Sequence, residues 1–198
     1  MNYSLIIDNF SNWIAINYTL TLVLFFLFVF FYSFLSLPGL PFFFILMGYL
    51  LGIFWSYIIA SIAVTVGSFC FFILSKYLFS KFFVKYYEKY SNKVNYFIKD
   101  STFEYLLIFR LIPGTPLIIQ NVILSLLNIS SYKFLCATIL GFTPFILFSI
   151  LIGNKVNNLL NLERIKAQDV FTWDLMLILI VFITIILIWI RFKKKKLS

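Results

Sequence analysis

Long apolar runs, separated by short polar or lysine-rich segments, make up most of this chain. A near-continuous run over residues 18–37 is long enough for the ~20 residues that a membrane-spanning helix needs. Further runs of this kind lie at residues 53–78, 132–152 and 172–190. The pattern predicts an all-α, multi-pass membrane protein with about four transmembrane helices.

Two further apolar runs are too short to cross a bilayer, and each follows a P-G-x-P motif. Proline removes a backbone donor and glycine weakens a helix, so in hydrocarbon such a break survives only where protein or trapped water satisfies the freed polar groups. Two breaks in corresponding positions of two halves point to a transporter-type site at the repeat interface. We therefore expect two re-entrant hairpins. The motifs are Pro38-Gly39-Leu40-Pro41, followed by the short run 42–51, and Pro113-Gly114-Thr115-Pro116, followed by 117–127.

The segment between residues 77 and 98 combines aromatic and basic positions at helical spacing. Lysines recur every four residues from Lys81 to Lys93, and aromatic residues recur every three or four on another face. This spacing predicts an amphipathic helix lying on an anionic membrane surface. The alternative is a solvated helix packed on a soluble partner.

Small residues at helical spacing predict close helix packing in the second span. They are Ser56, Ala60, Ala63 and Gly67. In the third span, Gly141 and Pro144 predict a kink. We expect a polar loop at residues 153–169 after this span. The echo of an alanine four residues before a glycine, at similar distances after each motif, supports an internal repeat.

The composition agrees with a membrane protein, since 63% of the residues are hydrophobic against about 45–50% in soluble domains. The net charge of +9 comes largely from clusters at residues 76–99 and 193–196, which flank apolar spans. That is the pattern of cytoplasmic membrane-facing loops, not of a nucleic-acid groove. We expect a cell (inner) membrane protein with cytoplasmic N- and C-termini, whose partners are anionic membrane lipids and not nucleic acid. The first hairpin would then enter from outside and the second from inside; a homo-oligomer is left open.

The candidate chemistry argues against an enzyme. There is no histidine and there are two cysteines, Cys70 and Cys136, in apolar segments, which excludes a zinc site of the usual Cys/His kind. Without a Ser/His/Asp set, a metal cluster or a phosphate-cradling glycine loop, we expect no catalysis, no metal and no cofactor. The domain organisation expected is an N-terminal segment at 1–17, a membrane domain at 18–155, and a loop, last span and basic tail at 156–198.

Arg110 is the most informative charged residue, because it lies in the apolar run directly before the second motif. An arginine at bilayer depth costs ~2.5–3.5 kcal/mol on insertion scales and should face protein, water or a lipid head group. Its guanidinium suits a phosphate, although neutralising broken-helix carbonyls is an equal alternative. Asn121 would cap the unwound backbone, with ligand contact as the minority alternative. The substrate-binding candidates are Arg110, Asn121, Gln120 and Glu104, the last of which could instead pair with nearby lysines.

These residues resemble the DedA/VTT-domain superfamily, also called SNARE-associated Golgi proteins, in the branch with P-G-x-P in the second hairpin. The resemblance rests on Arg110-x-x-Pro113-Gly114-x-Pro116-x4-Asn121 and on later positions, and in the first half on glycines. Two departures from the family pattern are Ser125, where a glycine is usual, and a first hairpin (37–52) without an acidic residue. The later positions are Phe134, Thr138, Gly141, Pro144 and Gly153, and the first-half glycines are Gly48, Gly52 and Gly67.

The resemblance implies two oppositely oriented re-entrant hairpins in an inverted repeat and a lipid transporter or scramblase. Bacterial relatives are associated with undecaprenyl-phosphate recycling and dependence on the proton-motive force. The leading hypothesis is therefore movement of phospholipid or polyprenyl phosphate between leaflets. The alternatives are an ion-coupled secondary transporter of a small anionic solute, and a membrane assembly factor that recruits partners through residues 77–98.

Overall fold

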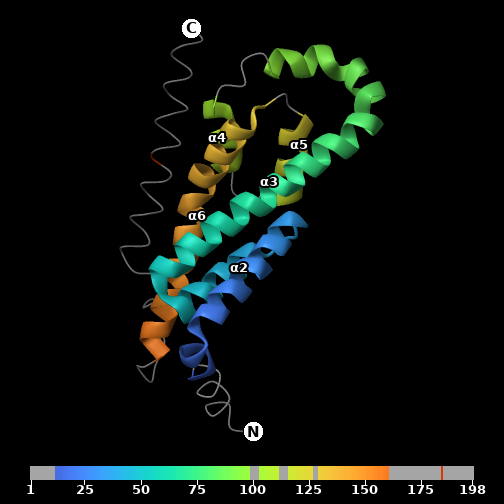
Figure 1. Ribbon diagram of the computed structural model, residues 1–198. Coiled ribbons are helices and arrows are strands. Elements are labelled where there is room, and N and C mark those ends of the chain that lie inside the picture. The colour runs from blue at the N-terminus through green and yellow to red at the C-terminus, as the bar shows by residue number, and fades with distance from the viewer. Residues whose placement is uncertain (1–11, 99–102, 112–115, 127–128, 161–183, 185–198) are drawn as a thin grey trace.

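The computed structural model describes residues 12–98, 103–111, 116–126, 129–160 and 184, and the side chains of these residues except at 78–98, 104–105, 126 and 157–160. Within these ranges every element is a helix, which confirms the all-α class. Figure 1 shows their arrangement as an elongated bundle. The helices are α2 (Tyr18–Phe34), α3 (Leu40–Ile98), α4 (Phe103–Leu111), α5 (Leu117–Leu126) and α6 (Ser131–Leu160).

α2 and residues 40–51 of α3 form an antiparallel helical pair, here called the first hairpin. The hydroxyl of Tyr18, at the start of α2, donates to the carbonyl of Leu51 at 3.5 Å. At the other end of α2, the ring of Tyr32 lies 4.9 Å from the ring of Phe43. The first P-G-x-P motif therefore lies at the turn of this hairpin, where the sequence predicts a helix break.

α2 is shorter than the span expected at residues 18–37. It has 17 residues and ends at Phe34. Ser36 follows with a φ of 53°, which is not helical, and Pro38 disfavours helix in the residue before it. These two residues end α2 before it reaches the ~20 residues that a membrane span needs. α2 is therefore one arm of a hairpin.

Two helical stretches in the described ranges are long and apolar enough to cross a membrane. They are Leu40–Tyr77 and Ser131–Val156. The span expected at 172–190 lies outside the described residues, apart from Thr184. The total number of spans, and the re-entrant placement of the hairpins in a membrane, thus stay predictions.

Gly52 turns the chain between the first hairpin and the long part of α3. Its φ of 73° and ψ of 179° suit glycine alone, because a Cβ would be strained there. Across this turn the hydroxyl of Ser56 donates to the carbonyl of Met47 at 2.7 Å. α3 then continues as one helix to Ile98, so residues 77–98 are helical as predicted, and Figure 1 shows this last part curving across one end of the bundle. Its place on a membrane surface stays a prediction.

α4 and α5 are the arms of the second expected hairpin, and the name second hairpin is used for them below. α5 has 10 residues, in agreement with the short run expected at 117–127. Its first turn is closed by the amide of Gln120, which donates to the carbonyl of Pro116 at 3.2 Å. Pro113 and Gly114 lie outside the described residues.

α6 is longer than the span expected at residues 132–152. It passes through Gly141 and Pro144 as one helix and ends at Leu160, so the expectation that a polar loop begins at Gly153 is wrong. The physical reason is that residues 154–160 contain neither proline nor glycine, and their polar side chains do not prevent a helix.

Glycines let the helices approach closely, as expected from their spacing. A Cβ at Gly67 would overlap the carbonyl oxygen of Phe30 in α2. A Cβ at Gly48 would overlap the backbone of Ile150, and one at Gly153 would overlap the backbone of Ile45. The first hairpin thus packs closely against both the long part of α3 and α6. The other small residues predicted to pack, Ser56, Ala60 and Ala63, are fully buried.

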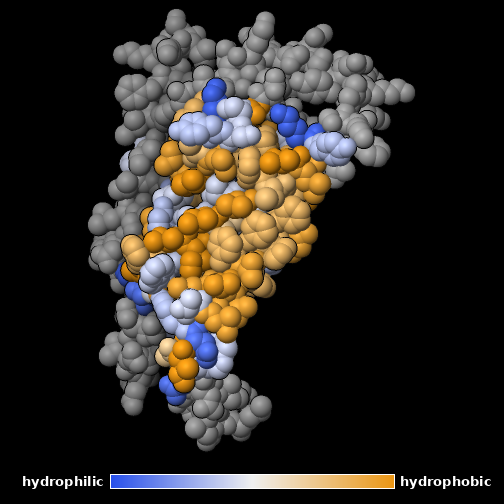
Figure 2. Space-filling view, in the orientation of Figure 1, coloured by the Kyte–Doolittle hydropathy of each residue, from blue (hydrophilic) through white to orange (hydrophobic). Residues whose placement is uncertain are grey.

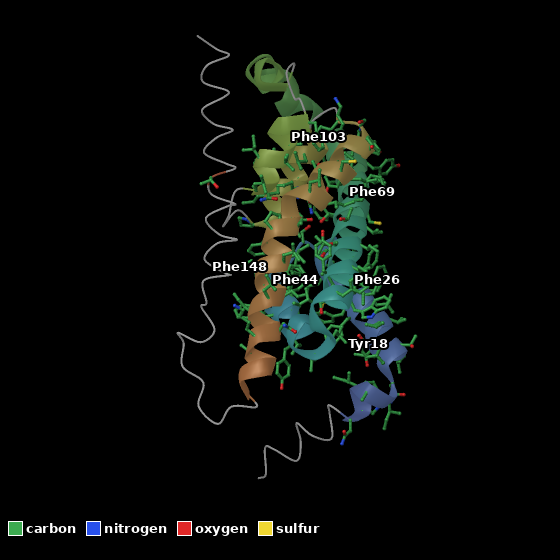
Figure 3. The ribbon with its side chains drawn as sticks, turned by 90° about the vertical axis from the view of Figure 1, so that its left-hand side faces the viewer. Tyr18, Phe26, Phe44, Phe69, Phe103 and Phe148 are labelled. Atoms are coloured by element: carbon green, nitrogen blue, oxygen red, sulfur yellow. The ribbon has the colours of Figure 1, made fainter. Side chains whose placement is uncertain are left out.

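The apolar core consists of two clusters, one for each hairpin. One includes Val29, Phe44 and Ile150, and the other includes Phe72 and Phe134. In Figure 3, Phe69 and Phe103 mark the end of the bundle that holds the second cluster, and Tyr18 and Phe44 lie toward the other end.

The two hairpins begin at opposite ends of the bundle (Figure 1). Because Leu51 returns to the start of α2, the chain crosses to the far end only through the long part of α3. The start of α2 and residues 78–98 consequently lie at opposite ends, whereas the predicted topology places both the N-terminus and this linker in the cytoplasm. The side of the membrane on which each end lies stays a prediction.

The exterior of the described helices is apolar over much of its area. Figure 2 shows hydrophobic side chains across the face formed by α2 and α3. Phe31 of α2 and Phe54 and Ile62 of α3 are large apolar side chains that are each at least half exposed. Such a surface suits contact with lipid tails.

Candidate functional site

Arg110 lies near the end of α4 and is buried, with 3% of its side chain exposed. α6 reaches it closely at Gly141, where a Cβ would overlap the Cβ of Arg110. The glycine that the sequence assigns to a kink thus has another role: it allows the backbone of α6 to approach the arginine.

The guanidinium is held by two carboxamides from the first turns of α5. Nη2 of Arg110 donates to Oδ1 of Asn121 at 2.8 Å, and Nη1 donates to Oε1 of Gln120 at 3.3 Å. Both carboxamides are buried. These bonds join the two arms of the second hairpin close to its motif, and they account for two of the guanidinium nitrogens.

Two phenylalanines of α6 flank the same guanidinium. Cζ of Arg110 lies 4.8 Å from the ring centre of Phe134 and 5.1 Å from that of Phe142. Cation–π contacts at such distances are worth about 0.5–2 kcal/mol, more when water is excluded. Phe134 belongs to one apolar cluster and Phe142 packs against the other. Arg110 therefore lies at the junction between the two clusters.

The described contacts of Arg110 are all to neutral groups. Its Nε is buried without a hydrogen-bond partner. None of the seven Asp and Glu residues of the chain has a described side chain, so the contacts of Glu104, which lies in α4, are outside the described residues. Within the described ranges, no group of three residues could hold a metal ion.

Asn121 also connects the two hairpins. Its Nδ2 donates to Oγ of Ser36, at the turn of the first hairpin, at 3.0 Å. Ser36 is itself buried, and its hydroxyl donates to the carbonyl of Ser33 at 3.3 Å. Ser36, beside the first break, thus meets residues from both arms of the second hairpin. Together they form one buried polar cluster, which consists of Ser36, Arg110, Gln120 and Asn121.

Both motifs and Arg110 lie within one domain of a known family. The family model of the VTT domain matches residues 37–155. The chain belongs to this family, that of the DedA/SNARE-associated Golgi proteins. No solved structure matches the chain. The matched range of the VTT domain includes both P-G-x-P motifs and Arg110, and the protein is accordingly a helical membrane protein of a family regarded as transporters or as lipid-related proteins.

The VTT domain brings together three of the four predicted binding residues: Arg110, Gln120 and Asn121. Asn121 was expected mainly to cap the backbone of the second motif. Its two described side-chain bonds go to Arg110 and Ser36. The capping role stays a prediction, because residues 112–115 of the motif lie outside the described residues.

Sequence reasoning missed Ser36 and Phe142 as members of this site. A serine between two leucines, shortly before a proline motif, was the available signal for Ser36. For Phe142 there was none, because one phenylalanine among 27 is uninformative.

Proposed function

We propose that the protein moves a phosphate-bearing lipid, a phospholipid or a polyprenyl phosphate, between the leaflets of the membrane without catalysing a reaction. In this proposal Arg110 binds the phosphate. The observation that carries it is a buried guanidinium that two carboxamides hold and whose Nε has no hydrogen-bond partner. The guanidinium fork binds phosphate oxygens in pairs, and such charge-assisted bonds are stronger than those to carboxamides.

A phosphate can take the place of the two carboxamides on the guanidinium. An arginine at bilayer depth costs ~2.5–3.5 kcal/mol on insertion scales, which carboxamides and aromatic rings offset only in part. The oxygens of Gln120 and Asn121 occupy the positions that phosphate oxygens would take on Nη1 and Nη2. Exchange of these oxygens for those of a phosphate gives the guanidinium an anionic partner.

The position of the site favours a lipid over a small solute. Ser36 is buried while its neighbour Leu35 is 55% exposed, and Asn121 is buried while Ile119 is 48% exposed. The exposed side chains that neighbour the polar cluster in sequence are thus apolar on both hairpins. An opening between the hairpins at this point would lead sideways into lipid, so that a head group could enter while its tails stay in the bilayer.

The proposal is tested by reconstitution into vesicles. Leaflet exchange is followed for fluorescent phosphatidylglycerol, for a labelled polyprenyl phosphate, and for a labelled diacylglycerol that lacks the phosphate. We expect the protein to accelerate the two phosphate lipids above their rates in protein-free vesicles and to leave the diacylglycerol rate unchanged. Equal phosphate-lipid rates with and without protein reject the proposal.

The same vesicles separate the alternatives. Uptake of labelled inorganic phosphate that collapses with a proton or sodium gradient, without lipid exchange, would favour the ion-coupled solute transporter. Loss of cellular function on deletion of residues 77–98, with Arg110→Ala unaffected, would favour the assembly factor.

A further inference from the structure

Asn121 makes two hydrogen bonds of different kinds with one carboxamide. Its oxygen accepts from Nη2 of Arg110 at 2.8 Å, within the second hairpin. Its nitrogen donates to the hydroxyl of Ser36 at 3.0 Å, in the first hairpin. Because a carboxamide is planar, its oxygen and nitrogen turn together. Neither bond can be displaced far without disturbing the other.

Ser36 is held in place for this contact. Its φ of 53° lies in the left-handed region of the backbone. Residues other than glycine, asparagine and aspartate adopt this region at an energetic cost. Its hydroxyl accepts from Asn121 while donating to the carbonyl of Ser33, and the side chain is buried. Strained backbone that surrounding contacts maintain is often part of a switch.

We propose that Asn121 is a latch that couples phosphate binding at Arg110 to separation of the two hairpins. This inference rests on the proposed function. A phosphate oxygen that approaches Nη2 of Arg110 displaces the carboxamide oxygen of Asn121, since the anion binds the guanidinium more strongly and repels that oxygen. The carboxamide then turns, its nitrogen leaves Ser36, and the two hairpins lose the described side-chain hydrogen bond between them.

The exterior of each hairpin offers a place to measure their separation. Leu35 and Ile119 are about half exposed and lie next to the latch in sequence. Nitroxide labels on cysteines at these two positions, in the full chain with Cys70→Ala and Cys136→Ala, report the distance between the hairpins by electron paramagnetic resonance. The probes are dihexanoyl phosphatidylglycerol, dihexanoyl glycerol and inorganic phosphate.

We expect phosphatidylglycerol, but not the phosphate-free glyceride, to lengthen this distance in the otherwise unchanged protein. Ser36→Ala should lengthen it without any ligand and raise basal lipid exchange about threefold to tenfold, the shift in an equilibrium that one hydrogen bond supports. Ser36→Gly should act in the same way, although it suits the positive φ, because the lost bond and not the turn is the cause. Ser149→Ala is the matched control, since its hydroxyl bonds only to the Phe145 carbonyl in its own helix at 2.9 Å.

The latch is overturned if Ser36→Ala and Ser36→Gly leave both the distance and the exchange rate as they are. It is also overturned if phosphatidylglycerol does not change the distance. A lengthening by inorganic phosphate equal to that by phosphatidylglycerol supports the latch and identifies a free phosphate as its ligand. If phosphatidylglycerol separates the hairpins but the protein exchanges no lipid, the latch stands and the proposed function fails.

Discussion

The two halves of the molecule use the same contact between a long helix and the first arm of a hairpin, but different side chains stand there. In the first half, Gly67 of α3 lies against α2 at Phe30 and Ser33. In the second half, Gly141 of α6 lies against α4 at Arg110. The same kind of contact therefore occurs in both halves, but of the residues described at these two contacts, a charged one stands only at that of Gly141.

The second arms of the two hairpins differ in the same way. α5 carries Gln120 and Asn121, which hold the guanidinium. Residues 40–51 are apolar apart from Tyr49 and pack on α6 through Gly48. The difference teaches that polar groups gather in the second hairpin, whereas the second arm of the first hairpin serves packing. Under the proposed function the second hairpin binds the anion and the first supplies the serine of the latch.

The largest effect on stability is expected where α6 packs against residues 40–51 of the first hairpin. In Gly153→Ala, the new Cβ overlaps the backbone of Ile45, which cannot move aside as a flexible side chain could. We expect a loss of about 3 kcal/mol, the upper end for overpacking. Thermal unfolding in detergent measures it against Ser149→Ala in the same helix. Equal unfolding temperatures would show that the two halves are not packed in this way.

The repeated contact itself is tested by Gly67→Ala and Gly141→Ala. Each should lower the free energy of unfolding by about 1–3 kcal/mol, because both place a Cβ onto the facing arm. Only Gly141→Ala displaces Arg110, so its lipid exchange per folded molecule should fall well below that of Gly67→Ala. Equal exchange by the two variants would remove the functional difference between the halves.

The aromatic contacts of Arg110 are expected to matter less. Phe134→Leu and Phe142→Leu should each weaken phosphate-lipid exchange by the equivalent of about 0.5–2 kcal/mol, the worth of a cation–π contact. Phe72→Leu is the control, because Phe72 stacks on Phe134 at 4.3 Å and has no described contact with Arg110. A loss of exchange in Phe72→Leu as large as in Phe134→Leu would assign the effect to core packing.

The smallest effect is expected at a serine that makes no bond. Oγ of Ser68, next to Gly67, is buried without a partner. Because burying an unpaired hydroxyl is unfavourable, Ser68→Ala should leave stability unchanged or raise it by up to about 1 kcal/mol. Ser36→Ala, which removes a made bond, should not be stabilising. A clear destabilisation by Ser68→Ala, measured by thermal unfolding, would mean that its hydroxyl has a partner.

Much of this arrangement could be predicted from the sequence. The proline motifs predict where the helices break, and the short apolar runs predict the second arms of the two hairpins. Small residues at helical spacing predict the surfaces through which the helices contact one another. Arg110, Gln120 and Asn121 were predicted, together with Glu104, as candidate binding residues, because polar side chains beside a break in an apolar run need partners.

The rest depends on long-range packing that local patterns do not contain. The end of α2 follows from the turn at Ser36, so the first expected span is one arm of a hairpin. α6 continues past Gly153 because that glycine serves helix packing and does not end the helix. The Asn121–Ser36 bond joins residues 85 apart, and hydropathy carries no information about it.

The central claim, that Arg110 binds the lipid phosphate, is tested most directly by leaflet exchange of fluorescent phosphatidylglycerol in vesicles containing the wild-type protein, Arg110→Ala or Arg110→Lys. Before the assay, the three proteins are shown to elute at the same volume from a size-exclusion column and to incorporate into the vesicles in equal amounts. The account predicts the protein-free rate for Arg110→Ala and a reduced but measurable rate for Arg110→Lys, which keeps the charge without the fork. Exchange by folded Arg110→Ala at the wild-type rate would contradict it.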